Sequence, residues 1–268
     1  MKAWKTALWN FTKWLLVVSY LVAALAFAKS KSSLVNCTAI SVSIADSLNN
    51  AFVTKADVLK IIERNYSNLI GIPISMINTH AIEQQLATMQ AVKRAEAYKT
   101  INGKLSIDIE QRKPIMRVIN RYGQSYYIDT EGQILPLSSK FTSHVLVVNG
   151  NIVEPFDLEP NLEVMKWSGQ KVNESSPLIC KLYEFAQFVT SDPFWKAQIT
   201  QVYVDNPNNI ELIPRIGPHT IILGDLNDYE TKLAKLKLFY ERALPEEGWN
   251  KYKQINLKYS NQVVCTKR

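Results

Sequence analysis

The segment from Val92 to Gln111 reads VKRAEAYKTINGKLSIDIEQ, and it decides the fold of the first part of the chain. Two alternating runs flank Asn102-Gly103, and an Asn-Gly pair in this setting is a strong signal for a β-hairpin. The segment therefore predicts two strands, Val92–Lys99 and Lys104–Gln111, joined by a tight turn.

A strand and two helices are expected before this hairpin. Ala39–Ile44 alternates apolar and polar residues, which is typical of a strand. Thr54-Lys55-Ala56-Asp57 resembles a capping box and predicts a helix that ends near Asn65. Apolar residues at helical spacing predict a second helix over about Thr79–Met89. The order strand, helix, helix, strand, strand describes a compact α+β module.

The character of the sequence changes after Asn120, from the first module to short strands with frequent turns. Because Ile115–Ile119 adds one more strand before this change, the first module is expected to span residues 39–119. Residues 120–268 are expected to form a mixed, mainly antiparallel β domain with two amphipathic helices, Leu178–Val189 and Tyr229–Ala243. The strands predicted in this domain are Tyr126–Ile128, Ile134–Leu135, Val145–Val148, Ile199–Val204, Ile210–Ile213, Thr220–Leu223, Ile255–Tyr259 and Gln262–Val264.

The N-terminal residues include an uncharged apolar run between two lysines. The run Leu15–Ala28 lies between Lys13 and Lys29, and with Trp14 it is fifteen residues long, whereas a helix needs about 20 apolar residues to cross a bilayer. Interfacial Trp and snorkelling Lys side chains extend such a run. The sequence therefore favours an uncleaved membrane anchor over 14–31 after a cytoplasmic tail over 1–13. The anchor residues are Trp14, Leu15, Leu16, Val17, Val18, Tyr20, Leu21, Val22, Leu25 and Phe27.

Two other interpretations of this run stay open, a cleaved signal peptide and a buried core helix. Ala26-Phe27-Ala28 has the small-x-small pattern of a signal-peptide cleavage site. An anchor and a signal peptide both place the chain after Lys29 across the membrane. The lysine excess before the run favours a cytoplasmic N-terminus.

Positive charge is concentrated at the two ends of the chain. Of the formal net charge of +7, residues 1–31 and residues 251–268 contribute +5 each, which leaves −3 for the residues between them. A nucleic-acid-binding face needs clustered Lys and Arg on the folded body. We therefore expect no nucleic-acid partner. A content of 47% hydrophobic and 21% charged residues also excludes a disordered chain and a polytopic membrane protein.

No motif in the sequence nominates catalytic chemistry. Histidine and cysteine residues are far apart and show no spacing of a metal site, a triad or a disulfide framework. They are His80, His144, His219, Cys37, Cys180 and Cys265. Asp225 and Asp228 precede a predicted helix, where acids stabilise the N-terminus without catalysis. We expect no enzyme, no cofactor, no metal and no small-molecule substrate.

The C-terminal residues predict a strand at the boundary of a sheet. Ile255–Tyr259 alternates, and Gln262–Val264 follows it as β structure. A boundary strand offers unpaired backbone groups, which another chain can use by β-addition. The alternative is an ordinary edge strand that Lys251, Lys253 and Lys258 protect from such pairing.

Several short segments, taken together, point to a known family. They are Gln111–Ile115, Tyr127–Asp129 with Gly132, Leu135–Ser138, Ile213–Gly217 with His219, Phe239-Tyr240, Gly248–Tyr252 and Asn256–Cys265. In this order and spacing the chain resembles the bacterial cell-division family FtsQ, called DivIB in Gram-positive organisms, and especially its Bacteroidota form. The resemblance covers nearly all of the chain beyond the anchor. It implies one transmembrane helix, a POTRA domain (β-α-α-β-β) over 39–119 and a C-terminal β domain over 120–268.

The resemblance also implies a function. Members of the family are non-catalytic, single-pass scaffolds of the divisome that septum formation requires, and they link early and late division proteins. It implies an inner-membrane protein at the septum with a cytoplasmic N-terminus, a periplasmic body, contact with membrane lipid, and FtsB-like, FtsL-like and other divisome partners. In the family, the FtsB contact involves the last strands, around an Asp-Leu-Arg-Tyr segment that reads Asn256-Leu257-Lys258-Tyr259 here. The expected partner-binding residues are Leu257, Lys258, Tyr259, Ser260, Asn261, Gln262, Val263 and Val264.

The chain departs from the family pattern in this segment. Asn256 and Lys258 replace Asp and Arg, and a Trp found later in some members is absent near Thr266. These departures imply a remodelled interface. Two other classes of protein are weighed against the scaffold: a hydrolase or binding protein secreted after Ala28, and an outer-membrane assembly protein with POTRA modules. The second needs the long alternating strands of a transmembrane barrel, which the region after Asn120 does not predict.

Overall fold

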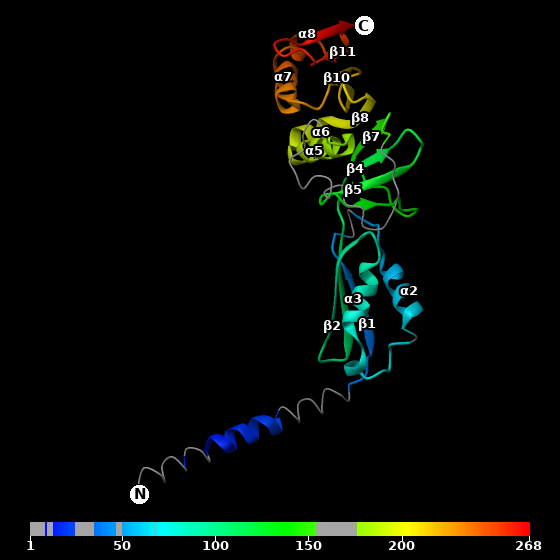
Figure 1. Cartoon of the computed structure of the whole chain (residues 1–268), viewed down its shortest axis with the longest axis vertical. Helices are drawn as coiled ribbons and strands as arrows, with labels where there is room; N and C mark the ends of the chain where they lie inside the picture. Colours follow the sequence, from blue (N-terminus) through cyan, green and yellow to red (C-terminus); the bar gives the residue numbers. More distant parts are fainter. Residues whose placement is uncertain (1–8, 10–12, 25–34, 47–49, 67, 154–175) are drawn as a thin grey trace. The chain divides into compact units, whose positions relative to one another are not determined.

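The computed structural model describes residues 9, 13–24, 35–46, 50–66, 68–153 and 176–268. Contacts within the chain divide it into two compact units (Figure 1). Unit 1 comprises Met1–Asn49 and Val53–Gln111, and unit 2 comprises Asn50–Phe52 and Arg112–Arg268.

The N-terminal segment is helical over residues 13–24. Its described apolar side chains are exposed, and two of the expected anchor residues, Leu25 and Phe27, lie outside the described residues. Among the described residues, no helix combines the length and the apolar character that a membrane span needs. The membrane anchor therefore stays a prediction from the sequence.

In the described part of unit 1, a sheet of three strands packs against two α-helices. Its elements are β1 (Ala39–Ile44), α2 (Lys55–Asn65), the 3-10 helix η1 (Ile74–Met76), α3 (Thr79–Ala87), β2 (Val92–Lys99) and β3 (Lys104–Gln111). β3 lies in the middle of the sheet, parallel to β1 and antiparallel to β2. The predicted order of strand, helix, helix, strand, strand is confirmed, and β2 and β3 form the predicted hairpin.

Local sequence signals set the ends of these elements. At the start of α2, the Asp57 backbone N–H donates to Thr54 Oγ1, while the Thr54 N–H donates to the Asp57 carboxylate at 3.1 Å. This is the reciprocal pattern of a capping box. Gly103 closes the β2–β3 turn at φ +76°, and the Asn36 carbonyl oxygen lies 2.5 Å from where a Cβ would stand. Only glycine fits this turn.

In the described part of unit 2, nine strands form one mixed sheet, and the labelled helices lie along one side of it (Figure 1). The strands are β4 (Pro114–Ile119), β5 (Ser125–Asp129), β6 (Ile134–Leu135), β7 (Leu146–Gly150), β8 (Ile199–Asn206), β9 (Asn209–Pro214), β10 (Thr220–Gly224), β11 (Tyr252–Asn256) and β12 (Val264–Lys267). Their order across the sheet is β12-β11-β10-β9-β8-β7-β4-β5-β6. The pairs β4–β7, β7–β8 and β10–β11 are parallel, and the other neighbouring pairs are antiparallel.

The helices of unit 2 include the two that the sequence predicts. They are α5 (Leu178–Ser191), α6 (Pro193–Gln198), α7 (Tyr229–Arg242) and α8 (Leu244–Glu247). α5 and α7 bury the expected stripes, among them Phe185 and Leu236, in the core against the sheet. The short helices α6 and α8 differ from the expectation of two helices. Each has Pro in its first turn, and Asp192 caps α6, so a Pro-based start signal was present in both.

The boundary between the units lies earlier than the sequence suggested. We expected Ile115–Ile119 to complete the first module at residue 119, but β4 pairs with β5 and β7 of unit 2, and unit 1 ends at Gln111. Met116 and Val118 are fully buried in the core of unit 2. Alternation along a strand predicts that one face is buried, but it does not identify the sheet that the strand joins.

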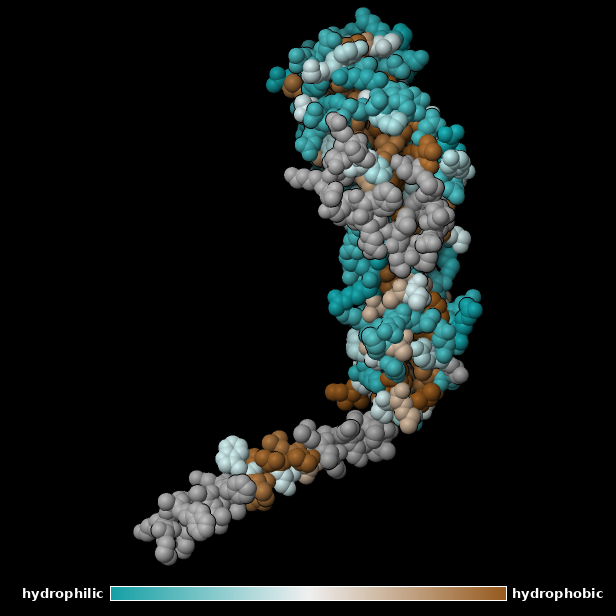
Figure 2. All heavy atoms as spheres, viewed as in Figure 1, coloured by the Kyte–Doolittle hydropathy of each residue, from teal (hydrophilic) through white to brown (hydrophobic). Residues whose placement is uncertain are grey.

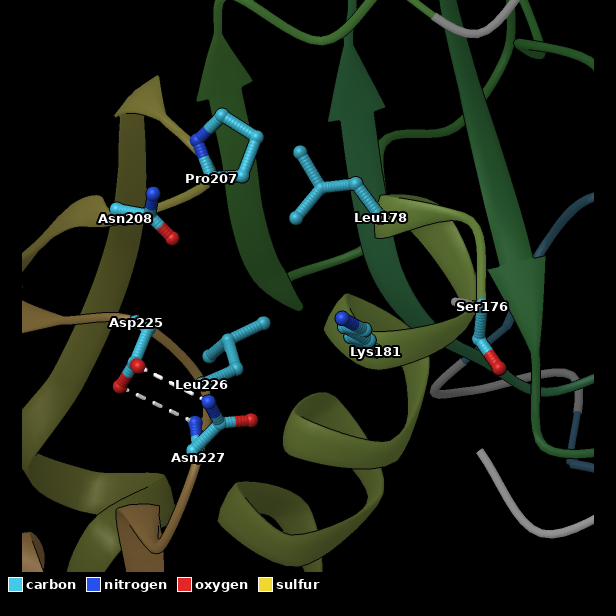
Figure 3. A pocket seen from close by; sticks show the side chains of 8 residues that line it. All are labelled: Ser176, Leu178, Lys181, Pro207, Asn208, Asp225, Leu226 and Asn227. Atoms are coloured by element: carbon cyan, nitrogen blue, oxygen red, sulfur yellow. Dashed lines mark hydrogen bonds between the residues drawn. The ribbon is translucent and has the colours of Figure 1, made fainter. Parts of the chain in front are cut away.

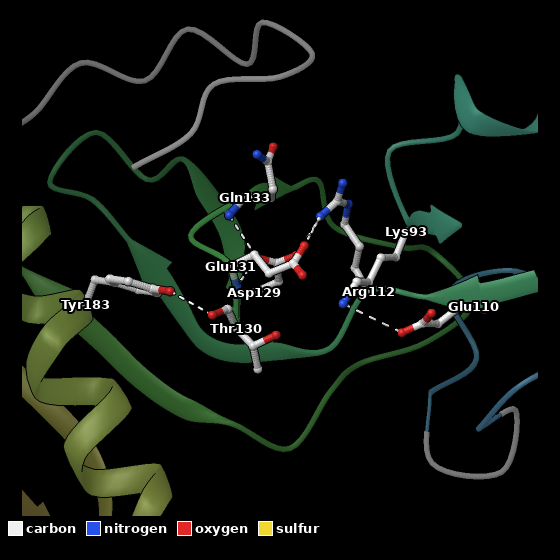
Figure 4. Close-up of polar contacts among 8 residues, drawn as sticks. All are labelled: Lys93, Glu110, Arg112, Asp129, Thr130, Glu131, Gln133 and Tyr183. Atoms are coloured by element: carbon white, nitrogen blue, oxygen red, sulfur yellow. Dashed lines mark hydrogen bonds and ion pairs between the residues drawn. The ribbon is translucent and has the colours of Figure 1, made fainter. Parts of the chain in front are cut away.

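A polar cluster fixes the turn between β5 and β6 (Figure 4). The buried Asp129 carboxylate accepts from Arg112 Nη1 at 3.0 Å and from the backbone N–H groups of Glu131 and Gln133 at 2.8 Å each. The Tyr183 hydroxyl of α5 donates to the Thr130 carbonyl at 2.9 Å. Burial, followed by the charge of Asp129, raises the pKa of Tyr183 to about 12. These bonds satisfy a buried charge and tie α5 to the turn.

Candidate functional site

The last strand of the chain, β12, forms one edge of the sheet of unit 2. It pairs antiparallel with β11, with Ile255 opposite Cys265 and Asn256 opposite Val264. Within the described residues, no strand pairs with the outer side of β12. A strand in this position leaves a row of backbone N–H and C=O groups for another chain.

The strands at this edge begin and end differently from the prediction. β11 covers Tyr252–Asn256 rather than Ile255–Tyr259, and β12 covers Val264–Lys267 rather than Gln262–Val264. Residues 257–263 form the connection between these strands. The strand edge that another chain could use therefore extends from Val264 to Lys267, beyond the expected segment.

Seven of the eight predicted partner-binding residues lie at the surface or partly buried, and Leu257 is the exception. Leu257 is fully buried in the core, and its N–H donates to the Ile222 carbonyl at 2.9 Å. Its role as a contact residue is therefore corrected: a side chain in the core is not offered to a partner. Val263 is half-buried against the core. The exposed residues are Lys258, Tyr259, Ser260, Asn261, Gln262 and Val264.

Side chains on other elements hold the connection between β11 and β12 in place. The Lys235 ammonium of α7 donates to the carbonyls of Tyr259 at 2.6 Å and Ser260 at 3.1 Å. The Lys258 ammonium donates to Asn209 Oδ1 at 2.7 Å. No local sequence pattern marks Lys235 or Asn209 as part of this site, because both are distant in sequence from the connection.

The outer surface of this edge combines apolar and basic groups. Tyr259 is 50% exposed and Val264 is 41% exposed, whereas Cys265, the neighbour of Val264 in β12, packs against the core. Lys253, Lys267 and Arg268 are exposed on or next to the same two strands. An aromatic and a β-branched side chain beside a strand whose outer side is unpaired within the described residues, with basic residues nearby, suit an extended acidic segment of another chain. We call Tyr259 and Val264–Lys267 the β12 edge.

A largely buried aromatic cluster lies at the start of β10, next to Arg268, the residue after β12. His219 Nε2 and the Tyr240 hydroxyl are 2.7 Å apart, and the rings of Tyr240 and Trp249 lie 5.3 Å apart between centroids. His219 Nδ1 has no hydrogen-bond partner within the described residues. Burial, with a smaller effect of the Arg268 charge, lowers the pKa of His219. A neutral, buried histidine in such a cluster is part of the core rather than of a reaction centre.

The other candidate residues for chemistry do not come together. His80 is exposed and lies 3.6 Å from Glu83. Asp225 binds the Lys232 ammonium at 2.5 Å, and Asp228 occupies the N-cap position of α7 at φ +48° without a side-chain bond to the helix. Of the two aspartates expected to stabilise the start of α7, Asp225 therefore does so through an ion pair with Lys232, and Asp228 forms no side-chain cap. In the part of the chain that the structure describes, no three His, Cys, Asp or Glu side chains are placed to hold a metal.

A small open pocket of about 260 Å³ lies between the start of α5 and the turns after β8 and β10 (Figure 3). Its lining mixes apolar and polar side chains, namely Ser176, Leu178, Lys181, Pro207, Asn208, Asp225, Leu226 and Asn227. Its carboxylate, Asp225, is engaged by Lys232 and by the side chain and backbone of Asn227. Burial opposes ionisation of Asp225, but these bonds outweigh it and lower its pKa. These bonds favour the ionised carboxylate of Asp225, which is already engaged by Lys232 and Asn227.

Comparison with known protein families assigns both units. Residues 113–266, more than half of the chain, match a family model described as FtsQ/DivIB, C-terminal related. Residues 35–110 match a model described as a POTRA-like domain. The two matches meet where unit 1 ends and unit 2 begins. No curated protein matches the chain.

Proposed function

The chain belongs to the FtsQ/DivIB family, and we propose that it is a non-catalytic, single-pass membrane scaffold of the divisome that septum formation requires. Its cell-division role follows from the family. In this proposal it links early and late division proteins through a complex with FtsL-like and FtsB-like chains, and it recruits other divisome proteins. Its kinship with the Bacteroidota form stays a prediction.

The open β12 edge is the observation that carries this proposal. An FtsB-like segment would add a strand to Val264–Lys267, and its side chains would meet Tyr259 and Val264. Lys253, Lys267 and Arg268 would attract acidic residues of that segment and fix its register. Asn256 and Lys258, the positions that depart from the family pattern, are bonded to each other, since the Lys258 N–H donates to Asn256 Oδ1 at 2.9 Å. The bond between these two positions therefore orders the backbone at the end of β11.

To test the β12 edge, Tyr259 is changed to Ala and the native partners are recovered from membranes with the tagged full-length chain. We expect recovery of the FtsB-like and FtsL-like proteins to fall, because an anchoring Tyr contributes about 1–2 kcal/mol, or roughly 5–30-fold in affinity. Tyr122→Ala is the matched control: Tyr122 is also an exposed Tyr of unit 2, in the turn between β4 and β5. Equal recovery by the folded Tyr259→Ala and Tyr122→Ala variants would remove Tyr259 from the interface.

We propose that the apolar run beginning at Trp14 is the membrane anchor, with the N-terminus in the cytoplasm and both units in the periplasm. The lysines that flank the run support this topology. Mass spectrometry of the chain purified from native membranes tests it. The intact N-terminus is expected, and a mature protein that begins at Lys29 would instead support a secreted protein.

Depletion of the protein in its native bacterium tests the cellular role. Loss of a divisome scaffold is expected to give filaments or chains with unconstricted division sites. Re-expression of the Tyr122→Ala variant should restore septa, and re-expression of the Tyr259→Ala variant should restore fewer. Normal division after depletion would contradict the proposed function.

A further inference from the structure

One end of unit 1 carries exposed apolar side chains that its fold does not use. They are Ile70, Ile72, Met76, Tyr98 and Ile101, and they include every exposed large hydrophobic side chain in the described residues between 35 and 111. Ile101 is 96% exposed and Met76 is 76% exposed. Brown side chains project at the lower end of unit 1 in Figure 2. We call these five residues the apolar tip.

The two loops that carry the apolar tip meet at the point where the chain enters unit 1. The Cys37 N–H donates to the Ile72 carbonyl, and the Gly71 N–H donates to the Cys37 carbonyl, each at 2.8 Å. On the other side of the same segment, the Thr38 N–H donates to the Gly103 carbonyl at 2.8 Å. The segment Val35–Thr38 therefore lies between the loop before α3 and the β2–β3 turn, and Tyr98 lies near the end of β2 that leads into this turn.

The apolar tip is built rigidly, so its exposure is a feature of the fold. The Gly103 N–H donates to the Thr100 carbonyl at 3.1 Å, and the Lys104 N–H donates to Thr100 Oγ1 at 3.0 Å. These bonds hold Ile101 at the outermost position of the turn. Hairpin turns usually carry Gly, Asn, Asp or Ser. We therefore expect the exposed Ile101, together with its apolar neighbours, to contact something outside unit 1.

The charge around the apolar tip is mainly positive, and the nearby Glu83 carboxylate accepts from the Ala97 N–H at 2.8 Å, next to Tyr98. The loop segments 65–82 and 97–107 contain no Asp or Glu, and Lys99 and Lys104 lie beside the tip. Lys99 reaches across to the other loop, where its ammonium donates to the Ser75 carbonyl at 3.1 Å. Apolar side chains at the end of a unit, with lysines beside the outermost of them, match the interface of a membrane that contains anionic lipid.

The short length of chain between the apolar run and unit 1 also limits which surfaces the apolar tip can contact. Seven residue steps separate Ala28, the end of the apolar run, from Val35. A fully extended chain spans at most about 25 Å over seven steps. If the run is embedded in the bilayer, Val35, at the end of unit 1 that carries the apolar tip, is held within that distance of the hydrocarbon boundary. A tether of this length gives a weak membrane contact a high effective concentration.

We propose that the apolar tip inserts into the headgroup region of the membrane that anchors the chain, with Ile101, Ile70 and Met76 entering the lipid and Lys99 and Lys104 contacting anionic headgroups. This inference rests on the membrane attachment proposed above. The contact would orient unit 1 on the bilayer surface, in addition to the covalent tether.

The test uses the full-length chain in vesicles of phosphatidylethanolamine and phosphatidylglycerol. Ile101→Cys, in a Cys265→Ser background, carries a nitroxide spin label, because Cys37 and Cys180 are buried and Cys265 is partly exposed. Thr88→Cys is the matched control, because Thr88 is also exposed. Thr88 precedes β2 and Ile101 follows it, so the length of β2, about 23 Å, separates the two positions. Power saturation compares collisions of each label with oxygen, which concentrates in lipid, and with a water-soluble nickel complex.

We expect the ratio of oxygen to nickel collisions to be several-fold higher at position 101 than at position 88. The Ile70→Ser substitution, which leaves the core intact because Ile70 is exposed, should lower the ratio at position 101. Equal, water-like ratios at the two positions would overturn the inference. A raised ratio that disappears as protein is diluted in lipid would overturn it too, because it would show a contact with a second copy.

Alkaline extraction of the same vesicles separates this inference from its premise. A chain that stays in the membrane while position 101 is water-exposed contradicts only the contact of the apolar tip. A chain that alkali extracts contradicts the anchor, and the inference then fails with the proposed topology.

Discussion

At the scale of single residues, His219 is a buried structural residue, and its protonation state is expected to affect the stability of the unit that carries the β12 edge. It directly precedes β10 and is bonded to the Tyr240 hydroxyl, and Arg268, the residue after β12, donates to the neighbouring Pro218 carbonyl at 2.7 Å. A Cβ placed on Gly217 would lie only 2.6 Å from the His219 ring, so the ring packs closely against this glycine. Protonation of His219 would place a positive charge in this packed site beside Arg268, so it should weaken folding.

The stability of unit 2 is therefore expected to fall in mild acid. Burial first, and Arg268 second, lower the pKa of folded His219 below its ordinary value of 6.5. The unfolded chain then binds more protons, so this stabilisation is complete above about pH 6.5 and is lost as the pH falls toward the folded pKa. Thermal unfolding between pH 7.5 and pH 5 measures the effect. His219→Gln, which keeps a side chain able to bond to Tyr240, should show a smaller decrease in Tm, and an equal decrease would exclude His219 as the cause.

At the scale of elements, helix α7 determines how the residues before β12 are presented. Two carbonyls of the connection between β11 and β12 accept from the same Lys235 ammonium. Bonds to exposed lysines add little to stability, but they restrict the conformations of a loop that a partner must recognise. Order in such a loop before binding reduces the entropy that association costs.

Lys235→Ala should therefore affect binding more than folding. We expect faster amide hydrogen exchange at residues 258–263 and a several-fold lower recovery of the proposed FtsB-like partner, with little change in Tm. Lys237→Ala is the control on the same helix, because the Lys237 ammonium stacks over the Phe194 ring at 5.0 Å from its centroid rather than bonding to the loop. Unchanged exchange at residues 258–263 in Lys235→Ala would show that other contacts order the loop.

At the scale of the whole molecule, the described residues form two separate hydrophobic cores. One core joins the sheet and helices of unit 1, and the other joins the nine described strands of unit 2 to α5 and α7. Each core excludes water from its own sheet. Damage to one unit should therefore stay within that unit.

A pair of matched core substitutions tests this independence. Ile107 in β3 and Ile128 in β5 are both fully buried, one in each core. Ile→Ala in a core destabilises a protein by about 2–5 kcal/mol. Hydrogen exchange of Ile107→Ala should accelerate within unit 1 alone, and exchange of Ile128→Ala within unit 2 alone. Acceleration in both units by either substitution would indicate one cooperative unit.

The sequence by itself determined the features that depend on neighbouring residues. The alternation around Asn102-Gly103 predicted the β2–β3 hairpin, and Thr54 with Asp57 predicted the start of α2. These signals suffice because a turn and a capped helix are built from residues a few positions apart. The resemblance to FtsQ/DivIB was also visible in the sequence, since it depends on the order of short motifs, and the family match confirms it.

Only the tertiary structure decided which distant residues meet. β4 alternates like its neighbours, yet its pairing with β5 and β7 assigns it to unit 2. Leu257 belongs to a segment that carries partner contacts in the family, but the register of β11 and β10 buries it. No local pattern marks Lys235, and none brings Ile70 and Met76 to the same end of unit 1 as Ile101. Each depends on a register or a loop contact between distant residues, which periodicity along the chain does not encode.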